Sequence, residues 1–102
     1  MNKILFQDNL FQLVKEGRKT ETRRMSYYGK IGDILIAQSD ISNNYVNIVI
    51  TNFYKEKLYD IDRTSILNEG FRNKEEFLEK WDEFYNNSSL NPEVSVYEFR
   101  LL

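Results

Sequence analysis

The sequence predicts an α+β fold with a largely antiparallel, curled sheet. Short stretches of apolar and β-branched residues, typical of strands, occur in the first half of the 102-residue chain and again at its end. Between them lie two stretches with helical spacing and helix-capping residues. Because strands flank this pair of helices instead of alternating with them, a parallel α/β sheet is not expected. The length fits a single domain spanning residues 1–102.

The N-terminal part of the chain is predicted to contain a strand, a helix and an extended segment. Lys3–Phe6 has the apolar character of a short strand. In the helix that follows, Asp8 is the predicted N-cap and Gly17 the predicted end. The apolar positions at helical spacing are Leu10, Leu13 and Val14. Thr20–Arg24 alternates in character and contains β-branched threonines, so we expect it to be extended.

The middle of the chain is typical of a β-hairpin. A turn containing two glycines is predicted at Tyr28–Asp33, followed by a short buried strand at Ile34–Ala37. A longer strand is predicted at Tyr45–Tyr54, where alternate positions are apolar. The polar stretch Ser42–Asn44 favours a turn between these two strands.

The second half of the chain is predicted to contain two helices and a closing strand. Asp60 is the predicted N-cap of a short helix that runs to about Leu67 and ends at Gly70. Asn73 is the predicted N-cap of a longer helix, from Lys74 to about Tyr85. Its predicted core-facing positions are Phe77, Leu78, Trp81, Phe84 and Tyr85. A polar loop over Asn86–Glu93 is then expected, followed by a strand in which Tyr97, Phe99 and Leu101 alternate with charged residues.

The composition excludes several classes of chemistry. The chain has no Cys and no His, which removes disulfides, thiolate zinc sites, cysteine nucleophiles and histidine triads. Catalysis would therefore depend on Lys, Arg, Thr, Ser, Tyr, Asp or Glu. We expect no metal and no cofactor.

Hydropathy and charge suggest where the protein acts and what it binds. No apolar run approaches the roughly 20 residues that span a bilayer, so we expect a cytoplasmic protein without a membrane partner. The net charge is −2, but residues 1–30 carry seven basic and three acidic residues, a balance of +4 that leaves −6 for the remainder. Such asymmetry fits either a surface for an anionic ligand or two solvated patches. The expected state is a monomer.

Four basic residues and two threonine hydroxyls lie close together after a glycine, in the segment 17–24. A solvated, charged edge strand would explain this density, because charges discourage pairing between sheet edges. A ligand site would explain it as well, because Arg and Lys suit a phosphate or a carbonyl oxygen that develops negative charge. Composition leaves both interpretations open.

The ordered residues of this segment resemble the G-x-K-x-x-T-x-R motif of ASCH domains, which are relatives of the PUA fold. The matching residues are Gly17, Lys19, Thr22 and Arg24. Further landmarks of that family are matched in order by Gly32–Leu35, Asn68–Phe71, the helix from Glu76 to Tyr85, and Val96–Phe99. The resemblance implies a PUA-like small curled β-barrel, antiparallel or mixed, flanked by two to three helices.

The chain is similar in particular to a branch of short bacterial ASCH proteins that remove the acetyl group from N(4)-acetylcytidine. The string Gly17-Arg18-Lys19-Thr20-x-Thr22-x-Arg24 carries this similarity. The resemblance implies that the catalytic residues are Lys19, Thr22 and Glu69. The predicted ligand-binding residues are Gly17, Arg18, Arg24 and Tyr28. Two positions depart from the branch, because Glu21 and Arg23 stand where its members are often apolar.

The proposed roles require a base for the Thr22 hydroxyl and a base for water, and more than one residue could supply each. A Thr22 nucleophile needs an adjacent base, and without His the choice falls on Lys19 or a carboxylate. Glu69 then either orients Lys19 or acts as the base for the water that releases the acyl group. In a regular strand Lys19 and Thr22 would project from opposite sides. Lys19 therefore joins Thr22 only if the chain is still turning after Gly17.

Other functions remain open from the sequence. The basic segment would also serve a non-catalytic RNA-binding ASCH module, and Lys with Thr would also suit a ribonuclease; an interaction module without chemistry is a further alternative. The predicted partners are accordingly an acetylated cytosine nucleoside or single-stranded RNA. Tyr27 and Tyr28 either stack on a base or pack within the fold. A sequence pI near 5.2 gives little long-range attraction to a polyanion, which favours the nucleoside.

Overall fold

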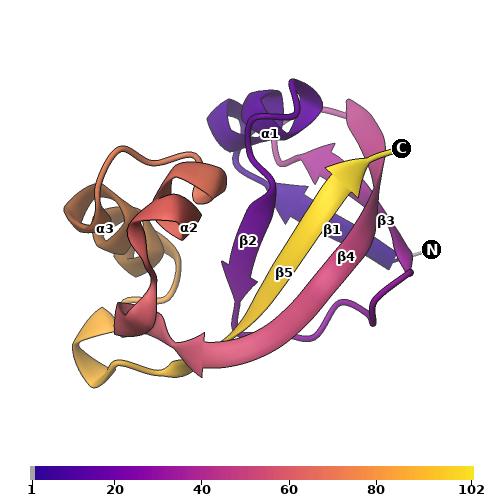
Figure 1. Cartoon of the computed structure of the whole chain (residues 1–102). Coiled ribbons are helices and arrows are strands. Elements are labelled where there is room, and N and C mark those ends of the chain that lie inside the picture. The colour runs from indigo at the N-terminus through magenta and orange to yellow at the C-terminus, as the bar shows by residue number, and fades with distance from the viewer. Residues whose placement is uncertain (1) are drawn as a thin grey trace.

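In the computed structural model, which describes residues 2–102, five strands form one curled sheet with helices on one side and at one end (Figure 1). The strands are β1 (Asn2–Phe6), β2 (Glu21–Arg24), β3 (Ile34–Ser39), β4 (Tyr45–Lys57) and β5 (Glu93–Leu101). The α-helices are α1 (Asp8–Lys15), α2 (Arg63–Glu69) and α3 (Lys74–Phe84). Two 3-10 helices, η1 (Leu58–Asp60) and η2 (Ser88–Leu90), complete the set.

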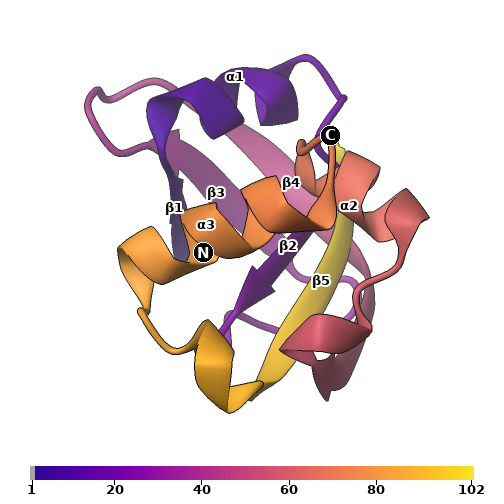
Figure 2. The ribbon, with the colours of Figure 1, turned by 90° about the vertical axis from the view of Figure 1, so that its left-hand side faces the viewer.

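The sheet is mixed, and its two edge strands are β1 and β2. The strand order is β1-β3-β4-β5-β2, with β1 parallel to β3 and the other pairs antiparallel. β4 has a register shift between Ile50 and Asn52, and an irregularity of this kind bends a strand and increases its twist. Figure 2 shows α3 lying across the side of the sheet where β1 and β2 run. The structure thus confirms the predicted curled barrel flanked by helices.

Two clusters of buried side chains hold these layers together. The first, inside the curled sheet and beneath α1, contains Ile4, Phe6, Phe11, Val14, Leu35, Ala37, Ile48, Ile50, Tyr97 and Phe99. The second, beneath α2 and α3, contains Leu58, Ile61, Ile66, Phe71, Phe77, Trp81, Val94 and Val96. β5 contributes to both clusters, because successive side chains of a strand project from opposite faces of the sheet. The sheet therefore separates two cores.

Three helix details differ from the predictions. Asp8 is the first residue of α1 and not its cap, since Gln7 precedes the helix and the Asp8 carboxylate accepts a hydrogen bond from Ser39 at 2.7 Å. The N-cap of α2 is Asp62 and not Asp60: its extended backbone lets its carboxylate accept from the Ser65 amide at 2.8 Å. Phe84 is 58% exposed, because it lies at the last turn of α3 where the helix passes the edge of the core.

The strands also differ in length from their predicted ranges. β4 continues three residues beyond Tyr54, and β5 begins at Glu93, inside the predicted polar loop. Both extensions pair with each other, up to the pair Lys57–Glu93. Backbone hydrogen bonds between β4 and β5 therefore extend the strand pairing beyond the residues that alternate between apolar and polar.

Candidate functional site

The turn after α1 positions Lys19. Gly17 has a φ of +77°, the left-handed conformation with which many helices end. The amides of Arg18 and Lys19 both donate to the carbonyl of Leu13, at 2.8 and 3.0 Å. β2 begins only at Glu21, so Lys19 precedes the regular strand, and Lys19 and Thr22 line the same pocket.

Lys19 and Glu69 form a buried ion pair. Their relative exposures are 2% and 3%. The Lys19 Nζ donates to Glu69 Oε1 at 2.7 Å and to the Glu69 carbonyl oxygen at 2.6 Å. Because Glu69 is the last residue of α2, this second bond satisfies a carbonyl that the helix leaves without an internal partner. The ammonium lies 5.9 Å from the ring centroid of Phe6 and 6.0 Å from that of Phe71, one ring from each core.

This position changes the acidity of Lys19. Burial is the largest influence and lowers the pKa of Lys19 below its ordinary value, because an ammonium is poorly solvated there. The carboxylate of Glu69 opposes this effect, whereas the positive charges of Arg24 and Arg23 add to it. The lowered pKa increases the fraction of neutral amine, the form that can accept a proton.

Thr22 and Arg24 lie on the other side of β2 from Arg23 and share a hydrogen bond. The Arg24 Nε donates to the Thr22 hydroxyl oxygen at 3.0 Å, and its Nη2 donates to the carbonyl of Leu5 in β1 at 2.7 Å. Arg24 thereby bridges the two edge strands. A guanidinium that donates to a hydroxyl oxygen leaves the hydroxyl proton available to a base and stabilises negative charge on that oxygen.

Lys19, Thr22, Arg24 and Glu69 all line one pocket of about 430 Å³, a size typical of sites for small ligands. β1, β2 and the end of α2 contribute one part of its wall, and α3 contributes most of the remainder. Its aromatic lining consists of Phe6, Phe71, Phe77, Trp81, Phe84 and Tyr85. The pocket lies between the two cores, where the edges of the sheet are not joined to each other by strand pairing.

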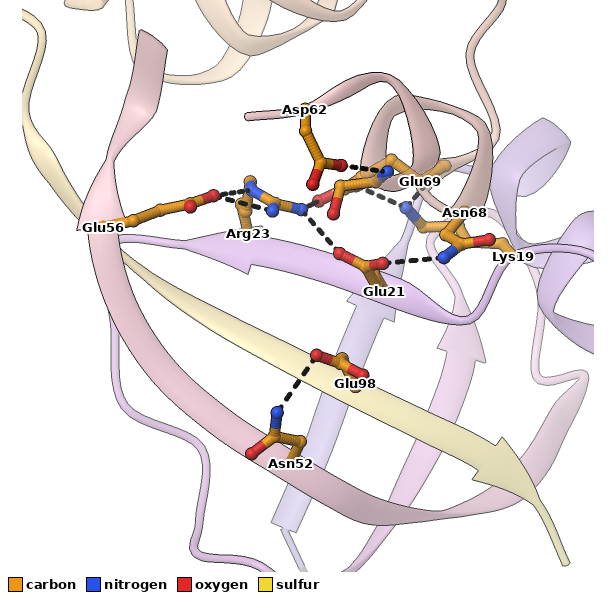
Figure 3. A network of polar contacts seen from close by, with 10 residues as sticks. Lys19, Glu21, Arg23, Asn52, Glu56, Asp62, Asn68, Glu69 and Glu98 are labelled. Atoms are coloured by element: carbon orange, nitrogen blue, oxygen red, sulfur yellow. Dashed lines mark hydrogen bonds and ion pairs between the residues drawn. The ribbon is translucent and has the colours of Figure 1, made fainter. Parts of the chain in front are cut away.

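Arg23 also lines the pocket, and a network of charged side chains surrounds it (Figure 3). Arg23 donates to Glu69 Oε2 at 3.2 Å, to Glu21 at 3.0 Å, and to Glu56 of β4 at 2.7 and 3.0 Å. Asn68 donates to the second carboxylate oxygen of Glu21 at 2.8 Å. Burial acts against the charged guanidinium, but the three carboxylates together raise the pKa of Arg23 above its ordinary value.

Three of the predicted ligand-binding residues lie outside the lining of the pocket. Gly17 ends α1, and Arg18, whose side chain is 72% exposed, pairs with Glu16 at 3.4 Å. Tyr28 packs edge-on against Tyr97 with 6.0 Å between ring centroids, and its ring lies 5.6 Å from the Arg24 guanidinium. These residues shape the surroundings of the site, and their direct contact with a ligand stays a prediction.

Several residues in and around the pocket were not among the site residues predicted from the sequence. Glu21 and Arg23 were only departures from a motif, although two charged residues two positions apart in a four-residue strand point to one side and can share a partner. The aromatic residues of α3 were assigned to the core alone. Asp40 and Lys80, which line the pocket, gave no signal in the sequence.

Over residues 2–102, no three His, Cys, Asp or Glu side chains are grouped so that they could hold a metal ion. None of the helices described there has the length and apolar character needed to cross a membrane.

Comparisons with known proteins identify the fold. The structure of an ASCH domain from Lactobacillus crispatus JV V101 matches with a TM-score of 0.78 at 12% identity, covering 98% of this chain and 79% of that chain. Protein EF3133 from Enterococcus faecalis V583, of family DUF984, matches with a TM-score of 0.83 at 17% identity, covering 100% of this chain and 76% of that chain. A mutant ASCH protein from Zymomonas mobilis matches with a TM-score of 0.69 at 9% identity, covering 96% and 67%.

The sequence itself matches no protein-family model and no curated protein. Three-dimensional similarity extends over nearly the whole chain, even though fewer than one residue in five is identical. The chain has the fold of an ASCH domain.

Proposed function

We propose that this protein is an amidohydrolase of the ASCH family that removes the acetyl group from N(4)-acetylcytidine or a related acylated cytosine compound. One observation carries the proposal: Lys19, Thr22, Arg24 and Glu69, all assigned from the family resemblance, line a single pocket of small-molecule size. The aromatic wall of that pocket offers flat apolar surfaces to a pyrimidine ring.

In the first step Thr22 is the nucleophile and Lys19 is the base. A neutral amine has two protons and one lone pair. The two acceptors of Glu69 occupy the two protons of Lys19, so the lone pair remains for the Thr22 hydroxyl proton. The Thr22 oxygen then bonds to the acyl carbon, and Arg24 stabilises the resulting oxyanion. The carbon–nitrogen bond breaks, and the leaving amine takes the proton from Lys19.

In the second step a water molecule releases the acyl group. Lys19, neutral again, accepts a proton from the water as its oxygen attacks the carbonyl carbon of the Thr22 ester. The ester carbon–oxygen bond breaks, the Thr22 oxygen regains a proton from Lys19, and acetic acid leaves and releases its proton to the solvent as acetate. The same base thus serves both halves of the reaction.

The charges around the pocket favour an uncharged ligand over RNA. Each cation in the lining already has a partner: Lys19 pairs with Glu69, Arg23 with three carboxylates, and Lys80 with Gln7 and Glu83. Arg24 is held by two oxygen acceptors. Cations paired in this way have less to offer a phosphate backbone, whose binding depends on neutralising its charges. A neutral acylated nucleoside makes no such demand.

The proposal is tested by measuring acetate release from N(4)-acetylcytidine by the purified protein. Thr22→Val keeps the side-chain shape and removes the nucleophile, so turnover should fall at least a hundredfold, whereas Thr22→Ser should retain part of it. Thr20→Val is the matched control, because Thr20 is a neighbouring hydroxyl outside the pocket lining and should leave the rate within about twofold.

Single-stranded RNA supplies the alternative outcomes. Wild-type protein that retains RNA in a salt-sensitive manner without releasing acetate would establish a binding module instead. Cleavage of the RNA would establish a ribonuclease. Equal acetate release by wild type and Thr22→Val would contradict the assigned nucleophile.

A further inference from the structure

Arg23 is an unusual side chain in this site because it is buried, fully charged and shared among carboxylates. Its side chain is 1% exposed. It reaches Glu69, which the mechanism uses, as well as Glu21 and Glu56, which the mechanism does not use. Figure 3 shows these carboxylates arranged around the guanidinium, with Lys19 on the far side of Glu69.

We propose that Arg23 is a positioning residue that shares the Glu69 carboxylate with Lys19, so that Lys19 can lose its proton without leaving Glu69 unpaired. This inference rests on the proposed amidohydrolase function, because it assigns a purpose to a neutral Lys19.

The two oxygens of the Glu69 carboxylate are divided between two cations. Oε1 accepts from Lys19 at 2.7 Å and Oε2 accepts from Arg23 at 3.2 Å, so each oxygen has its own cation. A buried carboxylate paired with Lys19 alone would hold the lysine in its ammonium form, because deprotonation would leave an isolated buried charge. With Arg23 on Oε2, the carboxylate keeps a permanent cation in either state of Lys19.

Glu21 and Glu56 keep Arg23 in this place. Glu56 accepts from two nitrogens of the guanidinium and holds it from β4, while Glu21 accepts from Nη1, the nitrogen that also reaches Glu69. Asn68 fixes the second oxygen of Glu21. The guanidinium is therefore held by three elements, β2, β4 and α2, and cannot follow Lys19 when that residue changes charge.

The charged groups that act on Lys19 are Glu69 from α2 and Arg23 and Arg24 from β2. Glu21 of β2 and Glu56 of β4 pair with Arg23, and Lys80 of α3 and Asp40 beyond β3 line the same pocket. Removing the charge of Arg23 takes away a neighbouring positive charge and should raise the pKa of Lys19. Removing the charge of Glu56 strengthens the positive field of Arg23 and should lower that pKa.

The experiment is a carbon-13 NMR titration of the lysine Cε resonances in the whole protein without substrate, with Lys19 assigned by its absence in Lys19→Met. Arg23→Met should shift the Lys19 midpoint upward by on the order of one pH unit, and Glu56→Gln should shift it downward by less. Arg23→Lys should restore most of the wild-type midpoint, because it keeps the charge. Arg100→Met, an exposed arginine of β5, is the control and should leave the midpoint unchanged.

Activity against pH supplies the second readout. The midpoint of the rise of kcat with pH should move with the Lys19 midpoint in each variant, because Lys19 acts in its neutral form, while KM stays within about twofold. A purely structural Arg23 would reduce stability without these opposite shifts. Lys19 midpoints that stay constant, or move in the same direction in Arg23→Met and Glu56→Gln, would overturn the inference. If Arg23→Met does not fold, Glu56→Gln and Arg23→Lys decide the matter.

The two proposals fail separately. Wild-type protein without acetate release refutes the hydrolase, whatever the lysine titration shows. Active wild-type protein with an Arg23-independent Lys19 midpoint refutes only the positioning role.

Discussion

The two sides of β2 differ in how much freedom they leave their polar groups. On one side, Thr22 and Arg24 face β1 and the pocket, and their side chains share one hydrogen bond and make one more, to Leu5. The Arg24 guanidinium also lies over the rings of Phe6 and Tyr28. On the other side, Glu21 and Arg23 have nearly every donor and acceptor occupied by Glu56, Asn68 or Glu69. The first side retains capacity for a ligand, and the second holds its groups in place.

This difference shows how the four-residue strand β2 provides both reactive side chains and the side chains that hold the site in place. Side chains alternate along a strand, so neighbouring residues serve opposite sides without any change of backbone. Glu69 connects the two sides: Lys19 binds one of its oxygens and Arg23 the other. Substitutions on the supporting side should therefore affect stability most, and substitutions on the pocket side should affect activity most.

Arg23→Met should produce the largest loss of stability. It leaves Glu21 and Glu69 buried without their shared cation, and breaking a buried ion pair by removing one partner costs about 3–5 kcal/mol. The free energy of unfolding in urea measures this loss. Arg100→Met, on the surface, provides the comparison, and similar urea midpoints for the two variants would contradict the supporting role.

Arg24→Met should mainly reduce activity. It removes the donor to Thr22 and the bridge to β1, so kcat/KM for acetate release should fall by about a hundredfold or more. The free energy of unfolding should fall by about 1–3 kcal/mol for the two hydrogen bonds, less than for Arg23→Met. Arg24→Lys keeps the charge but not the fork of donors and should recover little activity. A loss of activity below tenfold would remove Arg24 from the mechanism.

The smallest expected effect is on the pH dependence of stability, measured by comparing wild type with Lys19→Met. The sign of this effect follows from the pKa of Lys19. The pKa of Lys19 is lower in the folded protein than its ordinary value of 10.5, so between these two values the unfolded chain binds more protons. Stability contributed by Lys19 therefore rises with pH across that interval. Tyr54 and Tyr97, whose pKa values are raised chiefly by burial, act in the opposite direction in both proteins and cancel in the comparison.

The measurement is the difference in unfolding free energy between wild type and Lys19→Met at several pH values from 7 to about 10.5. This difference should grow in favour of the wild type as pH rises. A difference that shrinks would mean that the ion pair with Glu69 outweighs burial and that Lys19 stays charged.

The predicted helix ends and caps that the structure confirms depend on local sequence, because the conformation of these residues is set by their neighbours in the chain. Gly17 and Gly70 end helices with positive φ, and Asn73 caps α3 through its own side chain. The choice of Asp60 over Asp62 failed because either carboxylate can cap a helix. Only the path of the chain after η1 places Asp62 in the extended conformation that a cap requires.

The amino-acid order by itself determined the sequence of strands and helices, the turn at Gly17 and the motif residues Lys19, Thr22 and Arg24, since all of these depend on local spacing. The family resemblance named Glu69 as a site residue, but only the tertiary structure brings it, 50 residues away, against Lys19 and adds Glu56 and Arg23 to the network. Contacts between distant residues depend on how the sheet curls and where α2 packs. No local pattern of residues encodes either of these.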